Sequence, residues 1–384
     1  MTLAIRADRN AIVKSAIDAA IFDGGELGIQ VAAYRDGKLV IDVWGGIADA
    51  SGSPVSGDTL FNVFSVTKAV TAVAVHLQAE RGLLDYDEPI ASYWPEFSAM
   101  GKGAATVRHA LTHQSGVPQM PPGTSPETMC DWDAMCEGIA ASAPSFPIGG
   151  DPAYHSVTFG WILGEIVRRT DPRNRTFGRF VRDEIAAPLE IADLWIGMPD
   201  HVENRIARLR NDNAGDPRPP ADSDFVRSVP LNTQLVPEVF ERPDVRRACI
   251  PAVGGIFTAR SSARFWAMLA NGGELDGVRL LSAERVSTFN RPRPGNSSPD
   301  PVYFGMPMPL SEAGFWLGEA LPPVAAVKNP RAICCPGAGG SIGWADLDER
   351  VSVAICHNRM LNRRGSLDHP LVPVADAVRR ALAI

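Results

Sequence analysis

The chain has 384 residues, a formal net charge of −7, 45% hydrophobic residues and 21% charged residues. This length suffices for one large domain or two interleaved domains, and the composition is typical of a globular enzyme. No basic cluster indicates a nucleic-acid partner, and no apolar run is long enough to span a bilayer. We therefore expect neither nucleic-acid binding nor membrane insertion. The sequence carries no signal of oligomeric state.

The first residues lack the basic region, apolar core and small-residue cleavage site of a secretory signal, which predicts a cytoplasmic protein. The chain contains six cysteines: Cys130, Cys136, Cys249, Cys334, Cys335 and Cys356. So few cysteines in a chain of this length are typical of reduced structural thiols, not of a disulfide framework. The vicinal pair also lacks the Cys-x-x-Cys spacing of a redox motif.

Hydrophobic periodicity predicts the first elements of the chain. Apolar residues recur at helical spacing over 9–21. Two strand patterns, at 27–34 and 39–44, flank Asp36-Gly37, a signature of a hairpin turn. A strand-like segment then leads into an almost wholly apolar helix that ends before Gly82.

Helices dominate the middle of the chain and strands return after it. Helical patterns lie at 106–113, 126–141, 156–169 and 177–187, with Ser125 and Ser156 as expected caps, and 211–224 is a polar loop. Further strands are predicted at 252–257, 302–306, 314–319, 341–347 and 351–357, with helices at 261–271 and 375–382.

Strands at both ends with helices between them predict that the two ends of the chain share one sheet and that the middle is an inserted helical region. We expect an α+β fold, with an antiparallel sheet flanked by helices. The expected domains are a discontinuous α/β domain of residues 1–105 and 248–384, and a mostly helical inserted domain of residues 106–247.

Lys68 stands at the start of the apolar helix and is the first candidate for chemistry. A helix without a polar face is buried, and a buried ammonium lowers its pKa or acquires partners. Ser65 lies three residues earlier, within reach of Lys68 on a helix, so the pair predicts a nucleophile with its base. The alternative is a capping Ser65 and a Lys68 that extends to the surface.

Two further segments carry candidate residues. Tyr154 follows a Pro/Gly-rich loop just ahead of a helix, where a phenolate near a lysine acts as a general base; alternatively it packs its ring in the loop. In the segment Cys335-Pro336-Gly337-Ala338-Gly339-Gly340-Ser341, glycines allow close backbone approach to a ligand. A backbone N–H of this segment, with that of Ser65, predicts an oxyanion hole, whereas the alternative is a plain glycine turn.

Other motifs are weaker. His109 and His113 are four residues apart, but no third ligand accompanies them, so we expect a structural role and no metal site. No glycine pattern matches a phosphate loop or a dinucleotide fingerprint, so no cofactor is expected.

The three candidate segments occur in the order of the active-site motifs of the serine β-lactamase and penicillin-binding-protein superfamily, which this chain resembles. The connecting segments GLLDYDEPI (82–90), LTHQSGVP (111–118) and FGWILGEI (159–166) are similar to the class C branch and to family VIII carboxylesterases. The resemblance extends from about residue 10 to the C-terminus. It implies the β-lactamase/transpeptidase-like fold, with a serine site where the sheet and the helical region meet.

The resemblance also implies acyl-enzyme chemistry. Ser65 attacks a carbonyl, Lys68 and Tyr154 move the protons, and the N–H groups of Ser65 and Ala338 hold the oxyanion. Five further residues are expected to contact the substrate: His155, Ser156, Cys335, Gly337 and Gly339.

Two departures from the superfamily pattern concern the substrate. Ser156 replaces the Asn of Tyr-x-Asn, and Cys335 replaces the Lys of Lys-Thr-Gly. The cation that grips a β-lactam or peptidoglycan carboxylate is therefore missing. We expect a serine esterase acting on small-molecule esters of small or medium acyl groups. The alternatives are an acyltransferase that uses an alcohol or amine, a β-lactamase or D-amino-acid peptidase, and a non-catalytic binding protein.

Overall fold

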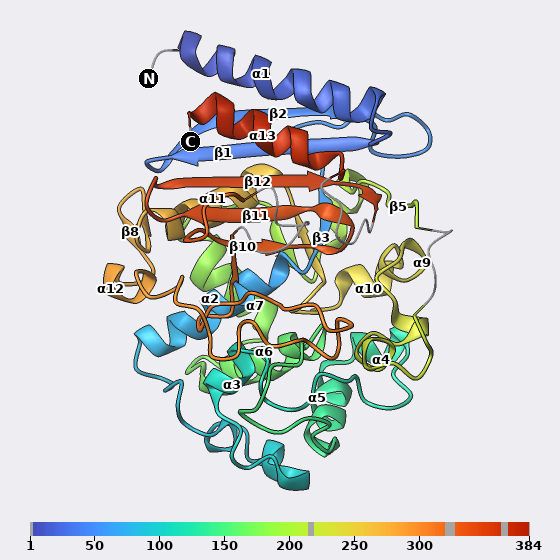
Figure 1. Ribbon diagram of the computed structural model, residues 1–384, viewed down its shortest axis with the longest axis vertical. Helices are drawn as coiled ribbons and strands as arrows, with labels where there is room; N and C mark the ends of the chain where they lie inside the picture. The colour runs from blue at the N-terminus through green and yellow to red at the C-terminus, as the bar shows by residue number, and fades with distance from the viewer. Residues whose placement is uncertain (1–2, 214–218, 319–326, 362–367, 384) are drawn as a thin grey trace.

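The computed structural model describes residues 3–213, 219–318, 327–361 and 368–383 (Figure 1). Its main sheet is antiparallel and has six strands in the order β2-β1-β12-β11-β10-β9. These strands are β1 (Gly28–Arg35), β2 (Lys38–Gly46), β9 (Trp316–Leu317), β10 (Ile333–Pro336), β11 (Ile342–Asp346) and β12 (Val351–His357). Strand β1 pairs with β12, so the two ends of the chain share one sheet, as predicted.

Three smaller sheets accompany the main one. They comprise β3 (Phe61–Phe64), β6 (Gly255–Phe257) and β4 (Leu194–Ile196); β5 (Arg210–Asn211) and β13 (Arg359–Met360); and β7 (Glu274–Leu275) and β8 (Val278–Arg279). The first of these sheets leads to a candidate site residue, because Ser65 follows β3 directly.

Helices cover both faces of the main sheet. Helices α1 (Leu3–Phe22) and α13 (Leu371–Leu382) lie side by side at the top of Figure 1, although they come from opposite ends of the chain. Helix α11 (Ala259–Ala270) packs against the other face, where its Trp266 fills the space beside Gly343 of β11.

The remaining helices lie mostly below the sheet in Figure 1. They are α2 (Thr67–Glu80), α3 (Val107–Leu111), α4 (Pro126–Cys130), α5 (Trp132–Ala141), α6 (Thr158–Thr170), α7 (Phe177–Val181), α8 (Asp224–Ser228), α9 (Pro237–Phe240), α10 (Pro243–Arg247) and α12 (Ala283–Val286). Short 3₁₀ or π segments are η1 (Ile90–Ser92), η2 (Pro95–Gly101), η3 (Arg182–Ala186), η4 (Asp200–Arg205), η5 (Leu231–Thr233) and η7 (Ala338–Gly340). The fold is thus the predicted α+β arrangement, whereas the domain limits at 105/106 and 247/248 stay a prediction.

Several local predictions are confirmed. The turn between β1 and β2 has positive φ at both Asp36 (50°) and Gly37 (73°), as the Asp-Gly signature requires. Ser125 caps α4 by accepting the N–H of Thr128. All six cysteines are free. His109 completes a capping box with Thr106 at the start of α3, which is a structural role.

Other local predictions are wrong. The expected helix at 126–141 is two helices, because Asp131 is extended (φ −91°, ψ 106°) and caps α5. Ser156 does not cap α6, whose N-cap residue Val157 has no side-chain bond. Residues 302–306 form turns instead of a strand, since Phe304 has φ 56° and Gly305 has φ 80°.

Two predicted segments reach beyond the described residues. The strand expected at 314–319 is observed as β9, and its last predicted residue, Glu319, lies outside them. Positions 214–218 of the loop expected at 211–224 also lie outside them. Among the helices of the described ranges, none is both long and apolar enough to cross a membrane.

Candidate active site

Ser65 occupies a strained turn between β3 and α2. The preceding residue, Phe64, has φ 47°, a left-handed conformation that costs an L-residue about 1–2 kcal/mol. Its ring packs edge-on against Phe240 at 5.2 Å, and its backbone pairs with Gly255 of β6. Packing around the fully buried Phe64 therefore stabilises the strained conformation. Ser65, the next residue, is half-buried.

Lys68, on the first turn of α2, is only 2% exposed, as its sequence context predicts. Its Nζ lies 3.1 Å from Oγ of Ser65 and donates to the carbonyls of Ser156 (2.7 Å) and Ala252 (3.1 Å). Burial lowers the pKa of Lys68 from 10.5 to about 7. A neutral amine has two N–H donors and one lone pair, so the two carbonyls take both donors. The lone pair then remains for the hydroxyl of Ser65.

Tyr154 packs against the same pair of residues. Nζ of Lys68 lies 5.4 Å from the centre of the Tyr154 ring, and Trp316 of β9 packs edge-on against that ring at 5.9 Å. Burial raises the pKa of Tyr154 well above its usual value, although hydrogen bonds with Trp316 and Ser65 act in the opposite direction. The phenol is therefore protonated in this environment, and the phenolate considered from the sequence is not its resting form.

The loop that carries Tyr154 is anchored by two residues that the sequence did not single out for this task. Oδ2 of Asp300 accepts the backbone N–H of Tyr154 at 2.9 Å. His113 has φ 61°, stacks on Tyr154 with ring centres 4.4 Å apart, and accepts the N–H of His155 at Nδ1 (2.9 Å). No local pattern indicates Asp300 or Trp316, whereas His113 lies in the LTHQSGVP segment.

The third predicted motif begins at the end of β10 and passes close to β3. A Cβ atom at Gly337 would lie 2.2 Å from the carbonyl oxygen of Val63, so only glycine permits this approach. Ala338 is half-buried and begins η7. Within the described residues, the backbone N–H groups of Ser65 and Ala338 donate no hydrogen bond. Both donors remain available for an oxyanion.

Cys335 lies beneath Ser65. Its Sγ donates to the backbone carbonyl of Ser65 at 2.8 Å, and burial raises the pKa of the thiol to about 12. Gly339 has φ 88°, and its carbonyl accepts a hydrogen bond from Nε2 of His369 at 3.0 Å. Both residues therefore support the turn that carries Ala338.

The other two expected substrate contacts are placed differently. His155 is fully buried: its Nε2 lies 2.8 Å from Oγ of Ser115 and its Nδ1 donates to the carbonyl of Ala153 at 2.7 Å. Both ring nitrogens of His155 are thus engaged inside the protein. Oγ of Ser156 is buried and has no hydrogen-bond partner among the described residues.

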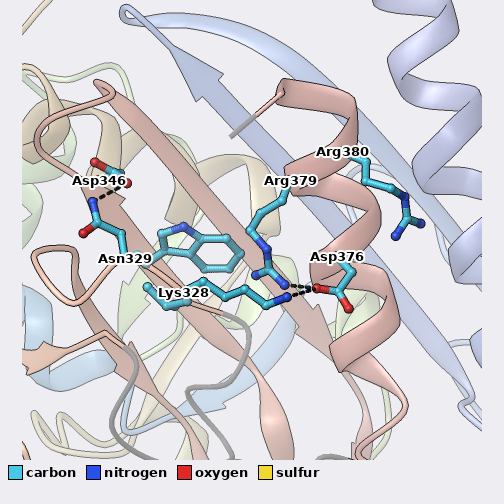
Figure 2. A pocket seen from close by; sticks show the side chains of 8 residues that line it. Lys328, Asn329, Asp346, Asp376, Arg379 and Arg380 are labelled. Carbon is cyan, nitrogen blue, oxygen red and sulfur yellow. Dashed lines mark hydrogen bonds and ion pairs between the residues drawn. The ribbon is translucent and has the colours of Figure 1, made fainter.

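A pocket of about 460 Å³ lies elsewhere, between β11, α13 and the segment that precedes β10 (Figure 2). It is lined by Val327, Lys328, Asn329, Trp344, Asp346, Asp376, Arg379 and Arg380. Lys328 and Arg379 both pair with Asp376 there. None of the predicted site residues lines this pocket. In the described parts of the chain, no three His, Cys, Asp or Glu side chains come together as a metal site.

Comparisons with known proteins show the family of the chain. The Beta-lactamase family profile matches residues 13–376. The chain is 36% identical over 379 residues to the "Esterase/beta-lactamase LipL" of Mycobacterium tuberculosis, covering 94% of this chain and 83% of that protein. A crystal structure of a family VIII carboxylesterase superposes with a TM-score of 0.86 and 31% identity over 97% of both chains.

A penicillin-binding-protein homologue from Caulobacter crescentus superposes with a TM-score of 0.85 and 36% identity, over 97% of this chain and 98% of that one. The family profile covers most of the chain, and these relatives share both its fold and its length. The chain therefore belongs to the Beta-lactamase family and is a serine hydrolase of the esterase/β-lactamase type.

Proposed function

We propose that the protein is a serine esterase that forms an acyl-enzyme at Ser65 with small carboxylic esters. The observation that carries this proposal is the coordination of Lys68. Two backbone carbonyls accept N–H groups of Nζ, and Nζ also lies 3.1 Å from Oγ of Ser65, so the neutral form of Lys68 keeps its lone pair for that hydroxyl. A neutral buried amine beside a hydroxyl is the arrangement that activates a serine nucleophile.

The residues divide the proton transfers between them. Oγ of Ser65 attacks the ester carbonyl while its proton passes to Nζ of Lys68. The oxyanion of the tetrahedral intermediate lies between the N–H groups of Ser65 and Ala338. When the intermediate collapses, Tyr154 donates its hydroxyl proton to the leaving alcohol oxygen and recovers a proton from the Lys68 ammonium. Water then attacks the acyl-enzyme, and the same groups move its proton in reverse.

The surroundings of Ser65 favour an uncharged acyl group. Cys335 replaces the lysine of the related penicillin-recognising enzymes, and its thiol is buried and protonated. No cation at this position pairs with a substrate carboxylate. In this proposal Gly337 and Gly339 shape the oxyanion turn, His155 holds the Tyr154 loop, and Ser156 contributes its carbonyl to Lys68.

Covalent labelling tests the proposal. A fluorophosphonate probe is expected to label the wild-type protein and Ser65→Ala to abolish labelling, while Ser51→Ala, an exposed serine, retains it. Wild type is also expected to hydrolyse p-nitrophenyl esters of two to six acyl carbons. Labelling that persists in Ser65→Ala, or failure to hydrolyse every ester of this series, contradicts the proposal.

Two further measurements on the same acyl-enzyme identify the acyl acceptor and test for β-lactam turnover. Transfer to an added alcohol or amine that outpaces hydrolysis would replace the esterase assignment by an acyltransferase. Efficient turnover of nitrocefin would restore a β-lactamase assignment despite Cys335. Absence of any covalent labelling would leave a binding protein on this fold.

A further inference from the structure

A row of aromatic side chains leads from Tyr154 to the protein surface. Tyr303 packs edge-on against Tyr154 at 5.2 Å, and Phe225 of α8 packs edge-on against Tyr303 at 5.6 Å. Phe304 follows at 5.6 Å from Phe225. Exposure rises along this row, from 3% at Tyr154 to 48% at Phe304. We call Tyr303, Phe225 and Phe304 the aromatic row.

The backbone that carries the row is held in an unfavourable conformation. Phe304 has φ 56°, which is uncommon for a bulky aromatic residue, and its side chain is nevertheless among the most exposed large apolar groups of the described chain. Oδ1 of Asp300 accepts the N–H groups of Val302 and Tyr303 at 2.9 and 3.1 Å. The other oxygen of the same carboxylate accepts the N–H of Tyr154, so one buried group fixes the backbone of Tyr303 relative to that of Tyr154.

The position of Tyr154 decides which part of an ester would meet the row. Tyr154 donates its proton to the leaving oxygen, so this oxygen must lie within hydrogen-bond reach of the phenol. The alcohol part of the ester extends from that oxygen on the side of the reacting carbonyl where Tyr154 lies, and Tyr303 packs against Tyr154 at 5.2 Å.

We infer that the aromatic row binds the alcohol part of the ester and selects apolar, preferably aromatic, alcohols. This inference rests on the proposed esterase function and adds the substrate class on the leaving-group side. Edge-to-face and offset-stacked aromatic pairs contribute more binding free energy than their buried area alone provides. In this inference a bound aryl group makes such contacts with Phe225 and Phe304. If the acyl-enzyme reacts with an alcohol instead of water, the row binds that acceptor in the same way.

Two isomeric esters test the inference. In 2-naphthylmethyl acetate the aromatic ring is in the alcohol part, and in methyl 2-naphthylacetate it is in the acyl part. We expect Phe225→Ala and Phe304→Ala each to lower the ratio of kcat/KM for the first ester to kcat/KM for the second by about 3–10-fold. Phe225→Leu, which keeps the side-chain bulk, is expected to lower it about 3-fold. Phe22→Ala is the matched control, because Phe22 ends α1 and is 92% exposed, and it is expected to leave the ratio unchanged.

Binding of the product alcohol separates this inference from the proposed function. In Ser65→Ala, which cannot form an acyl-enzyme, we expect Phe225→Ala to raise the Kd of 2-naphthylmethanol about 3–10-fold. An unchanged Kd together with an unchanged ester ratio overturns the inference while leaving the esterase intact. A ratio that rises instead assigns the row to the acyl part and also overturns it. If the wild type is inert towards both esters and the fluorophosphonate, the esterase proposal fails, and the Kd measurement still decides whether the row binds aryl groups.

Discussion

A carboxylate oxygen of Asp300 accepts the backbone N–H of Tyr154 at 2.9 Å, across 146 positions of sequence. Asp300 is 1% exposed, and burial raises its pKa from 3.8 to about 6 although three N–H groups face it. The positive charge of Arg293 opposes this rise in the pKa of Asp300. Burial lowers the pKa of Arg293 itself to about 10, so its guanidinium stays positive at neutral pH. A buried carboxylate that is costly to ionise and yet holds Tyr154 is typical of a functional site.

The pH profile is expected to show two ionisations on its acid side. Activity requires neutral Lys68, whose pKa is about 7, and ionised Asp300, whose pKa is about 6. Both requirements fail as the pH falls, so log kcat/KM should decline with a slope near 1 below pH 7 and approach 2 below pH 6. In Asp300→Asn the side-chain NH2 group faces at least one backbone N–H that the carboxylate accepted, so Tyr154 is held less well and we expect about 10-fold lower kcat. This variant has no carboxyl group to titrate, so the acid limb should have a slope of 1. A slope of 2 in this variant would contradict the role of Asp300.

Lys68→Met is expected to abolish activity and to stabilise the protein near pH 7. The fall in pKa from 10.5 to about 7 corresponds to about 5 kcal/mol of unfavourable burial at pH 7. The variant also loses the hydrogen bonds of Lys68, which offsets part of the gain in stability. We expect kcat to fall about 10³-fold and the free energy of unfolding to rise by about 1–3 kcal/mol. The unfolded chain binds the extra proton between pH 7 and 10.5, so wild-type stability should rise with pH there. Urea unfolding at pH 7 and 9.5 should show this rise in the wild type and its loss in the variant.

Lys102→Met is the matched control for Lys68. Lys102 is also fully buried, but its Nζ donates to three carbonyls, those of Ala99 (2.8 Å), Ala140 (2.8 Å) and Ser142 (2.5 Å). Three carbonyl acceptors use all three donors of an ammonium. Loss of Lys102 leaves them unpaired, so we expect this variant to be destabilised. Stabilisation by both substitutions would show that the coordination of Lys68 is not special.

Gly337→Ala is expected to damage the oxyanion turn. The added Cβ would lie 2.2 Å from the carbonyl oxygen of Val63, so the turn that carries Ala338 has to move. Displacement of one oxyanion donor costs about 10²–10³ in kcat. Gly103→Ala serves as the control, because the nearest atom to its added Cβ is 3.9 Å away. Wild-type rates of fluorophosphonate labelling and ester hydrolysis in Gly337→Ala would exclude this role for the turn.

The vicinal cysteines are expected to behave differently. Cys335 donates to the carbonyl of Ser65 at 2.8 Å, whereas Cys334 points to the opposite face of β10, since side chains alternate along a strand. Both are buried, so alanine at either position should cost about 1–2 kcal/mol of stability. Only Cys335→Ala should also lower kcat, by about 3–10-fold. Burial raises the pKa of Cys335 to about 12, so iodoacetamide at pH 8 should not inactivate the enzyme.

Three predictions that rest on local sequence or on the order of elements agree with the structure. The β1–β2 hairpin follows from Asp36-Gly37, and the burial of Lys68 follows from the apolar residues around it. The pairing of the two chain ends in one sheet follows from the order of strands and helices. Each of these features is set by neighbours within a few residues or by the succession of elements.

Hydrogen bonds of two side chains gave outcomes that the hydrophobic pattern does not indicate. The strand expected at 302–306 is a turn, because Asp300 accepts two backbone N–H groups there that a strand would otherwise pair. His155 follows Tyr154 directly, yet its ring is directed to Ser115 and not left free for a substrate. Neither outcome has a periodic signal in the sequence.

Local sequence placed Ser65 one helical turn from Lys68 and so named the candidate nucleophile and its base. Local sequence did not decide the pKa of Lys68 or of Tyr154, and therefore not their protonation states in the folded protein. That state depends on the carbonyl of Ala252, which is 184 positions from Lys68, on the burial that lowers the pKa of Lys68, and on the burial that keeps Tyr154 protonated. Desolvation and hydrogen-bond partners arise only when separate parts of the chain pack together, so tertiary structure, and not local sequence, raises the pKa of Tyr154 and lowers that of Lys68.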